Sequence, residues 1–162
     1  MNLLLTTAVI RKLRKNPSQQ LGEAANLDEI PAGMHIPSFV GASVSGSVVT
    51  PDALSGADAL IAFFDTGCDA CKPAIGEVVQ YALSNNLSPR QVVAVVCGEP
   101  AKAGSYLDAL GGVATVITED GVGPVTASFS PSGTPVFCIV DADGVVVRSG
   151  HTKTGLNRKV RG

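Results

Sequence analysis

The sequence contains no tryptophan and few other aromatic residues. Aromatic residues make up 4% of its 162 positions. Aromatic rings are the surfaces on which proteins stack the bases of single-stranded nucleic acid. Positive charge is also scarce, because 12 lysine and arginine residues stand against 14 acidic ones and the formal net charge is −2. Since nucleic-acid binding depends on a surplus of basic side chains, we expect no nucleic-acid partner.

Charge of either sign is limited as well. Charged residues account for 16% of the chain and hydrophobic residues for 45%. Disordered chains have the opposite balance, because they cannot bury enough apolar surface to fold. The length corresponds to about one domain. Without many aromatic residues, the core has to consist mainly of Val, Ala, Leu and Ile, and the short Val and Ile runs favour strands.

Cysteine and histidine are few. Four cysteines are too few for a small domain held together by disulfides. They are Cys68, Cys71, Cys97 and Cys138. A zinc site at the first two would need two further ligands. His35 and His151 both lie far from that pair in the sequence, so zinc stays a secondary alternative, and we expect no cofactor and no metal.

The N-terminal segment has an apolar stretch followed by basic residues. Residues 1–10 are apolar but too few to cross a bilayer as a helix, which needs about 20 residues. The basic cluster that follows is Arg11, Lys12, Arg14 and Lys15. This order is the reverse of a secretory signal and is typical of a cytoplasmic flank. Two interpretations stay open: the remnant of a membrane anchor, or an amphipathic helix on the domain or on a membrane surface. Membrane contact is therefore a possible interaction.

The hydrophobic pattern predicts an α/β domain. We divide the chain into an N-terminal segment and linker (1–32), a folded domain (33–150) and a C-terminal tail (151–162). Strands joined by helices are expected to be parallel, and the last two strands, joined by a turn at 141–144, antiparallel. The predicted strands are 37–39 and 46–49 (a hairpin), 59–64, 92–96, 113–117, 136–140 and 145–148. The predicted helices are 51–54, about 15 residues from Cys68, 101–110 and a short one within 122–129.

One segment carries a reactive pattern. A buried strand ends, a turn follows, and a helix is predicted to begin at Cys68, with Cys71 one turn inside it. Free backbone N–H groups and the helix dipole favour a thiolate at the first position. Cys68 is then the nucleophile that attacks a substrate disulfide, and Cys71 resolves the mixed disulfide. The alternative is two packing cysteines that happen to lie three residues apart.

The segment resembles a known family in several places. Residues 63–72, with the sequence FFDTGCDACK, resemble the thioredoxin-like superfamily, closest to TlpA/ResA-type and MauD-like thiol–disulfide oxidoreductases. Residues 36–39 are similar to a hairpin that precedes the core strand in that group, residues 133–135 to its cis-proline loop, and residues 140–144 to its final hairpin. The resemblance implies a thioredoxin-like fold with a mixed sheet flanked by helices and an extra N-terminal β-hairpin. It also implies a protein thiol or disulfide substrate and a redox partner.

The cis-proline loop is expected to bind substrate. In this loop Thr134 would present its backbone beside Cys68, and an extended substrate segment could pair with that backbone as an added strand. Pro135 would hold the loop in shape through a cis peptide bond. The alternative is an ordinary trans proline that opens a strand.

The sequence departs from the family at four positions. Gly67 stands where the family has a tryptophan, and Gly76 where it commonly has a proline. Ala62 replaces a buried acid of thioredoxins, and Ala74 replaces a glutamate of ResA-type proteins. Both acids are candidate proton acceptors for the resolving thiol. Gly67 is therefore an auxiliary position whose effect on catalysis is open.

Other residues have to be considered in place of the lost acids. Lys72, solvent or Glu77 are candidates for handling the proton of the resolving cysteine. Asp65 and Asp69 flank Cys68 and are expected to oppose its thiolate form. The direction of electron flow, as reductase, oxidase or isomerase, is open. So is the compartment, since the basic cluster favours the cytoplasm and the resemblance favours an extracytoplasmic site.

Three other functions compete with catalysis of disulfide exchange. A redox-inactive binding or maturation protein on the same fold would explain the missing family residues. A copper carrier would need a C-x-x-x-C and a well-placed histidine, but the spacing is one residue shorter and His151 is poorly placed. A peroxidase would need Thr or Ser at Asp65 and Pro at Ile61. Cys97 and Cys138 are expected to be inert core residues, although Cys97 could be a further redox partner.

Overall fold

The structure is a computed structural model that describes residues 30–151. The predictions for the apolar and basic segment, for most of the linker and for the tail concern residues 1–29 and 152–162, which lie outside the described part of the chain. Between residues 30 and 151, no helix is long and apolar enough to cross a membrane.

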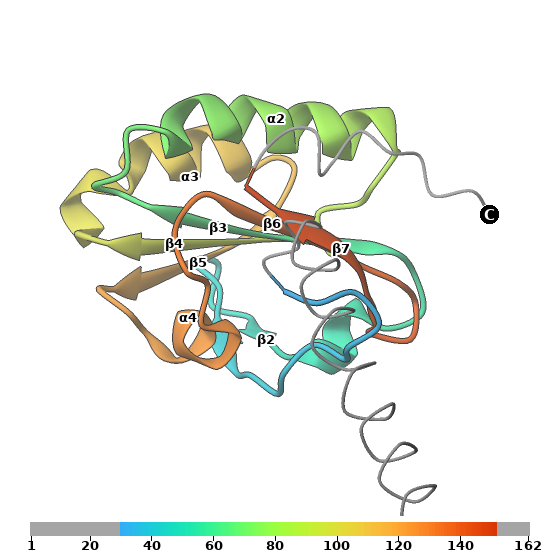
Figure 1. Ribbon diagram of the computed structural model, residues 1–162. Coiled ribbons are helices and arrows are strands. Elements are labelled where there is room, and N and C mark those ends of the chain that lie inside the picture. Colours follow the sequence, from blue (N-terminus) through green and yellow to red (C-terminus); the bar gives the residue numbers. More distant parts are fainter. Residues whose placement is uncertain (1–29, 152–162) are drawn as a thin grey trace, which may run out of the picture.

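A five-stranded mixed sheet forms the centre of the domain (Figure 1). Its strands are β3 (Ala59–Asp65), β4 (Val92–Gly98), β5 (Thr115–Asp120), β6 (Val136–Val140) and β7 (Val146–Gly150). The spatial order is β5-β4-β3-β6-β7. β3 is parallel to β4 and β4 to β5, whereas β6 is antiparallel to both β3 and β7. The α/β class, the parallel pairs joined by helices and the antiparallel last pair are all confirmed.

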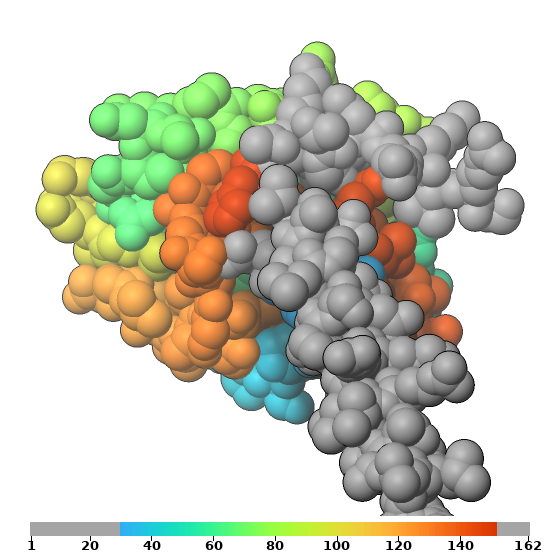
Figure 2. All heavy atoms as spheres, viewed as in Figure 1, coloured from blue at the N-terminus to red at the C-terminus, as the bar shows by residue number. Residues whose placement is uncertain are grey.

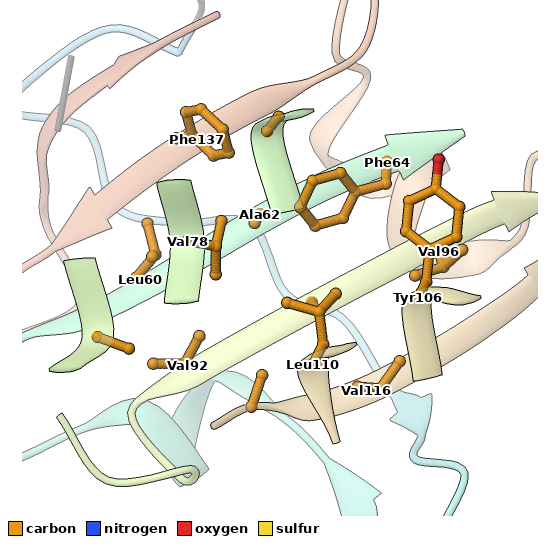
Figure 3. Close-up of a cluster of buried hydrophobic side chains, with 14 of the residues drawn as sticks. Leu60, Ala62, Phe64, Val78, Val92, Val96, Tyr106, Leu110, Val116 and Phe137 are labelled. Carbon is orange, nitrogen blue, oxygen red and sulfur yellow. The ribbon is translucent and has the colours of Figure 1, made fainter. Parts of the chain in front are cut away.

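The sheet separates two hydrophobic clusters. β3 and β4 are buried along almost their whole length, as expected for central strands covered on both faces. Alternate residues of these strands point to opposite faces, so Leu60 and Phe64 pack in one cluster and Ile61 and Phe63 in the other. Figure 1 shows α2 and α3 over the first face, and α4 and the N-terminal hairpin over the second. Figure 3 shows the first cluster.

Within residues 30–151, two of the three α-helices begin later than the sequence pattern predicts. The helices are α2 (Cys71–Ser84), α3 (Gly104–Leu110) and α4 (Pro124–Phe129), with short 3-10 turns at Pro51–Leu54 and Pro100–Lys102. The first one therefore starts at Cys71 and not at Cys68. Residues 68–72 form tight turns first, in which the N–H of Cys71 bonds the carbonyl of Cys68 at 3.2 Å and that of Lys72 bonds Asp69 at 3.4 Å. This leaves Cys68 outside the helix, in the turn that precedes it.

The N-terminal hairpin exists, but one of its strands was placed wrongly. Its strands are β1 (Gly41–Ala42) and β2 (Val48–Val49), so the strand predicted at residues 37–39 is wrong. The turn determines this register, because the N–H of Ser43 bonds the carbonyl of Ser47 and the Ser43 hydroxyl bonds the hydroxyls of Ser45 and Ser47. Pairing therefore starts directly beside the serine turn.

The short helix near Pro124 is confirmed, and a buried acid stabilises its start. The Glu119 carboxylate accepts hydrogen bonds from the N–H groups of Val125 and Thr126 at 2.7 and 3.0 Å, and from the Thr126 hydroxyl at 2.6 Å. These amides have no partner inside the helix. Gly123 allows the approach, because a Cβ there would lie 2.5 Å from the Glu119 Cδ. This capping places α4 directly ahead of the loop that leads to Pro135.

The final turn is confirmed at residues 141–144. The Asp141 carboxylate accepts the N–H groups of Asp143 and Val145 at 3.0 and 2.9 Å. Gly144 has φ +78°, a conformation that side chains disfavour. The turn therefore returns the chain from β6 to β7 in the antiparallel direction.

Candidate active site: the Cys68–Cys71 pair

The two cysteines lie where β3 ends and α2 begins. Cys68 is half-buried in the turn, and Cys71 is fully buried in the first cluster. The thiol of Cys68 donates to the carbonyl of Thr134 at 3.4 Å, and the peptide bond between Thr134 and Pro135 is cis. The turn and the proline loop, which are far apart in the sequence, thus meet at one face of the molecule (Figure 2). All four cysteines are free thiols.

The surroundings of Cys68 favour its thiolate. Burial by itself would raise the pKa of this thiol. Hydrogen bonds from the Cys71 thiol, from the Thr134 side chain and from the backbone at Cys71 and Ala70 outweigh burial, and the net result is a lowered pKa. The negative charge is therefore favoured on the sulfur that is accessible from solvent.

The surroundings of Cys71 favour its thiol. Burial raises the pKa of Cys71 to about 11, and the hydrogen bond and charge of Cys68 act in the same direction. Hydrogen bonds to the backbone at Asp65 and to the Thr134 side chain oppose this effect without reversing it. The pair thus consists of a half-buried sulfur that ionises readily and a buried sulfur that stays protonated and donates a hydrogen bond to Cys68.

Thr134 contributes more than the sequence suggested. The prediction for this residue concerned its backbone only, yet its side chain is also among the groups that lower the pKa of both Cys68 and Cys71. The Thr134-Pro135 sequence predicted the cis-proline loop. No pattern in the sequence predicted that the Thr134 side chain would affect both sulfurs.

Comparison with known proteins identifies the fold. No protein-family model matches the sequence, and no curated protein matches it significantly. Solved structures do match. The thioredoxin domain of a thiol-disulfide oxidoreductase from Bacteroides vulgatus has a TM-score of 0.63 at 17% identity, over 82% of this chain and 91% of that chain. A thiol:disulfide interchange protein from Chlorobium tepidum gives 0.60 at 22% identity, over 79% and 94%. The chain has a thioredoxin-like fold.

A third neighbour of the thioredoxin-like chain is described as secreted. It is a Mycobacterium tuberculosis disulfide oxidoreductase homologous to E. coli DsbE, with a TM-score of 0.58 and 20% identity over 74% of this chain and 87% of that chain. The neighbours are thiol–disulfide oxidoreductases of the thioredoxin family, in agreement with the TlpA/ResA-type resemblance. At these identities the similarity establishes the fold.

The charged side chains next to the Cys68–Cys71 pair contact other groups or solvent. The Asp65 carboxylate accepts the N–H of Gly67 at 2.7 Å and lies 3.7 Å from the Cys97 sulfur. The side chains of Asp69 and Lys72 are both exposed and lie 3.9 Å apart. A pair like this in water contributes little free energy. Lys72 and Asp69 therefore belong to the solvent face of the turn.

Glu77 is badly placed to serve the resolving cysteine. It lies six residues after Cys71 in α2. At 3.6 residues per turn it is rotated by roughly 240° around the helix and displaced by roughly 9 Å along it. The structure therefore directs this carboxylate away from the Cys71 thiol.

The other two cysteines are buried on the sheet. The Cys97 thiol donates to the carbonyl of Phe64 at 3.2 Å, and burial, followed by the charge of Asp65, raises its pKa to about 11. Burial raises the pKa of Cys138 to about 12. Cys97 follows Val96, which packs in the same cluster as Cys71, so strand alternation points Cys97 to the opposite face. Both thiols therefore stay protonated and apart from the reactive pair.

Two further residues support the site and were missed by sequence reasoning. The Tyr106 hydroxyl donates to the carbonyl of Asp65 at 3.1 Å. The Nδ1 of His151 lies 2.9 Å from the carbonyl of Pro135. The sequence indicated that His151 is poorly placed as a copper ligand. The residue is exposed, yet it contacts the proline loop. Across residues 30–151, no group of three or more His, Cys, Asp or Glu side chains could hold a metal ion.

Proposed function

We propose that the chain is a protein thiol–disulfide oxidoreductase in which Cys68 attacks and Cys71 resolves. The observation that carries this proposal is the division within the pair. The half-buried Cys68 has a lowered pKa, whereas the buried Cys71 has a pKa raised to about 11, and both contact Thr134. Exchange needs a nucleophilic thiolate within reach of a partner and a second thiol shielded until the first has reacted.

The proposed reaction has two steps. The Cys68 thiolate attacks one sulfur of a substrate disulfide, forming a mixed disulfide, and the other substrate sulfur leaves as a thiolate. Cys71 then gives its proton to solvent and attacks the Cys68 sulfur, which breaks the mixed disulfide and releases the second substrate sulfur as a thiolate. Both substrate thiolates take protons from solvent. The substrate leaves as a dithiol with two electrons gained, and the chain keeps a Cys68–Cys71 disulfide. A redox partner restores the dithiol, and the reverse sequence oxidises a substrate dithiol.

We place the substrate along the proline loop. Thr134 contacts Cys68 through its backbone carbonyl. A substrate segment whose cysteine reacts with the Cys68 sulfur therefore lies next to the Thr134 backbone. An extended peptide can pair with such a backbone as a short added strand. Gly67 and Lys72 lie at the exposed rim of the same turn, where they leave room for a partner protein. Two structural neighbours are described as a thiol-disulfide oxidoreductase and a thiol:disulfide interchange protein, and these descriptions support a protein substrate.

A trapping experiment tests the proposal. In a Cys71→Ser variant the mixed disulfide cannot be resolved, so adducts joined through Cys68 should accumulate and be released by reductant. Turnover with insulin as the probe substrate should fall at least about tenfold. The matched control is Cys68→Ser, which should form no adduct. If Cys71→Ser traps nothing and the natural chain does not reduce insulin, the proposed activity is wrong.

A redox-inactive binding or maturation role is the second candidate. It is favoured by the apolar residues that replace the family acids, since both Ala62 and Ala74 are buried in the cluster that contains Cys71. In that case the thiols serve structure or docking. The biological function would then survive in a variant that carries both Cys68→Ser and Cys71→Ser, whereas the proposed activity requires its loss.

We further propose that residues 33–150 form the domain that carries this activity. The described residues just outside these bounds contact it. The Ile30 backbone bonds the Ser149 hydroxyl, and His151 contacts Pro135. Limited proteolysis of the full chain should therefore leave a stable fragment that includes these flanking residues.

A further inference from the structure

The cluster around Cys71 contains a single buried side-chain oxygen. Its other buried members are aliphatic residues, phenylalanines and Cys71 itself, whereas Tyr106 on α3 adds a hydroxyl. The ring packs against Phe64, with centroids 5.6 Å apart. Figure 3 shows Tyr106 beside Phe64 and Val96, with its hydroxyl directed toward the end of β3. A phenylalanine would fill the same space, so packing alone does not explain the hydroxyl, whose burial costs free energy without a partner.

The partner of this hydroxyl belongs to the turn that carries Cys68. The hydroxyl of Tyr106 donates to the carbonyl of Asp65 at 3.1 Å. The same carbonyl accepts the N–H of Cys68, also at 3.1 Å. One backbone oxygen thus holds two donors, one from α3 and one from the reactive cysteine. The hydrogen bond connects α3 directly to the turn that follows β3.

The hydroxyl is a donor over the pH range in which Cys68 reacts. Burial raises the pKa of Tyr106 to about 12, and the negative charges of Cys71 and Cys68 act in the same direction. Because the hydroxyl therefore keeps its own proton at these pH values, the tyrosine cannot take the proton of the resolving thiol. It lies within electrostatic range of both sulfurs, yet its contribution is a hydrogen bond and not proton transfer.

We propose that Tyr106 is a positioning residue for Cys68. Its hydroxyl donates a hydrogen bond to the Asp65 carbonyl, and this carbonyl also accepts a hydrogen bond from the Cys68 N–H. The turn then presents the Cys68 sulfur to the backbone at Ala70 and Cys71, whose hydrogen bonds favour the thiolate. Without the hydroxyl, the Asp65 carbonyl keeps only one of its two hydrogen bonds, and the thiolate loses part of this stabilisation. The role of the residue rests on the proposed function, but its effect on Cys68 can be measured without any substrate protein.

Tyr106→Phe is the test, because it removes the hydroxyl and keeps the ring. The rate at which iodoacetamide alkylates Cys68 is followed by mass spectrometry between pH 5 and pH 10. At pH 6 we expect a rate roughly three to ten times lower than in the natural chain, since one pKa unit changes the thiolate fraction tenfold. At pH 10 the two rates should agree. Tyr81→Phe, the same change at the chain's only other tyrosine, should leave the profile unchanged.

Two results would overturn the proposal. One is an alkylation profile of Tyr106→Phe that matches those of the natural chain and of Tyr81→Phe. The other needs no variant and applies even if Tyr106→Phe does not fold. In the natural chain the Cys68 amide should exchange its hydrogen at least about tenfold more slowly than an open peptide, and unprotected exchange contradicts the inferred anchor. If Cys68 shows the predicted shift but Cys71→Ser traps nothing and insulin is not reduced, the proposed function fails and the positioning role stands.

Discussion

At the scale of single residues, the reactivity of the pair depends on which groups hydrogen bond to the two sulfurs. The Thr134 side chain is the one group from outside the C-x-x-C turn that lowers the pKa of both Cys68 and Cys71. It belongs to the proline loop, so the loop that we propose to bind substrate also adjusts the nucleophile. A partner that displaces this hydroxyl would change the reactivity of the thiol that it meets.

Replacement of Thr134 by valine tests this coupling. The side chains have nearly the same shape, so Thr134→Val removes the hydrogen bonds with little change in packing. We expect the pKa of Cys68 to rise by roughly half a unit to one unit, since a hydrogen bond to the charged form is lost. Thiolate absorbance at 240 nm during a pH titration measures this shift. The matched control is Thr118→Val at an exposed position of β5, and an equal Cys68 titration in both variants would refute the coupling.

At the scale of the elements, α4 depends on a capping interaction with a strand residue that the local sequence pattern does not predict. This six-residue helix has little intrinsic stability, because helices this short are marginal in water. The Glu119 carboxylate, near the end of β5, accepts the hydrogen bonds of the first amides of α4, which have no partner inside the helix. A strand residue thus determines where the helix begins and, through it, where the loop to Pro135 starts.

Replacement of Glu119 by glutamine should destabilise the domain. In Glu119→Gln one acceptor oxygen becomes an NH2 group that faces N–H and O–H donors. We expect the free energy of unfolding to fall by about 1–3 kcal/mol, the cost of leaving buried donors unsatisfied. Urea denaturation measures it. The control Glu99→Gln alters an exposed ion pair with Lys102 and should change stability by less than about 1 kcal/mol. Equal effects of the two variants would show that Glu119 does not cap α4.

At the scale of the whole molecule, the buried thiols make stability depend on pH. Burial raises the pKa of Cys71 and Cys97 to about 11 and that of Cys138 to about 12, above the ordinary 9.0. In the unfolded chain these thiols lose their protons first. The native state then binds more protons than the unfolded state, and stability falls as pH rises above about 9.

This dependence can be measured on the reduced protein. Between pH 8 and pH 10 we expect the free energy of unfolding to fall by at least about 1 kcal/mol. Cys138→Ala will have a lower stability at pH 8 because it leaves a cavity, but its loss between the two pH values should be smaller than that of the natural chain. Identical losses in the two proteins would mean that Cys138 does not contribute to the pH dependence.

The sequence by itself determined the local order of the domain. Continuous apolar runs predicted the buried strands, and the strand, C-x-x-C and helix succession located the reactive pair. Aspartate and glycine at 141–144 predicted the final turn. These features depend on neighbours in the chain, so their physical causes can be read from short stretches. The errors at the hairpin and at the start of α2 arose where side-chain and turn hydrogen bonds moved a boundary by a few residues.

Only the tertiary structure decided which groups surround the two sulfurs. Thr134 lies 66 positions from Cys68, and Tyr106 lies 41 positions from Asp65. The strand pairing brings these segments together, and no periodicity or motif encodes the direction of a single hydroxyl across such distances. A lowered pKa at one cysteine and a raised pKa at the other result from burial and from hydrogen bonds. Both exist only after the sheet has assembled and the proline loop lies against the turn.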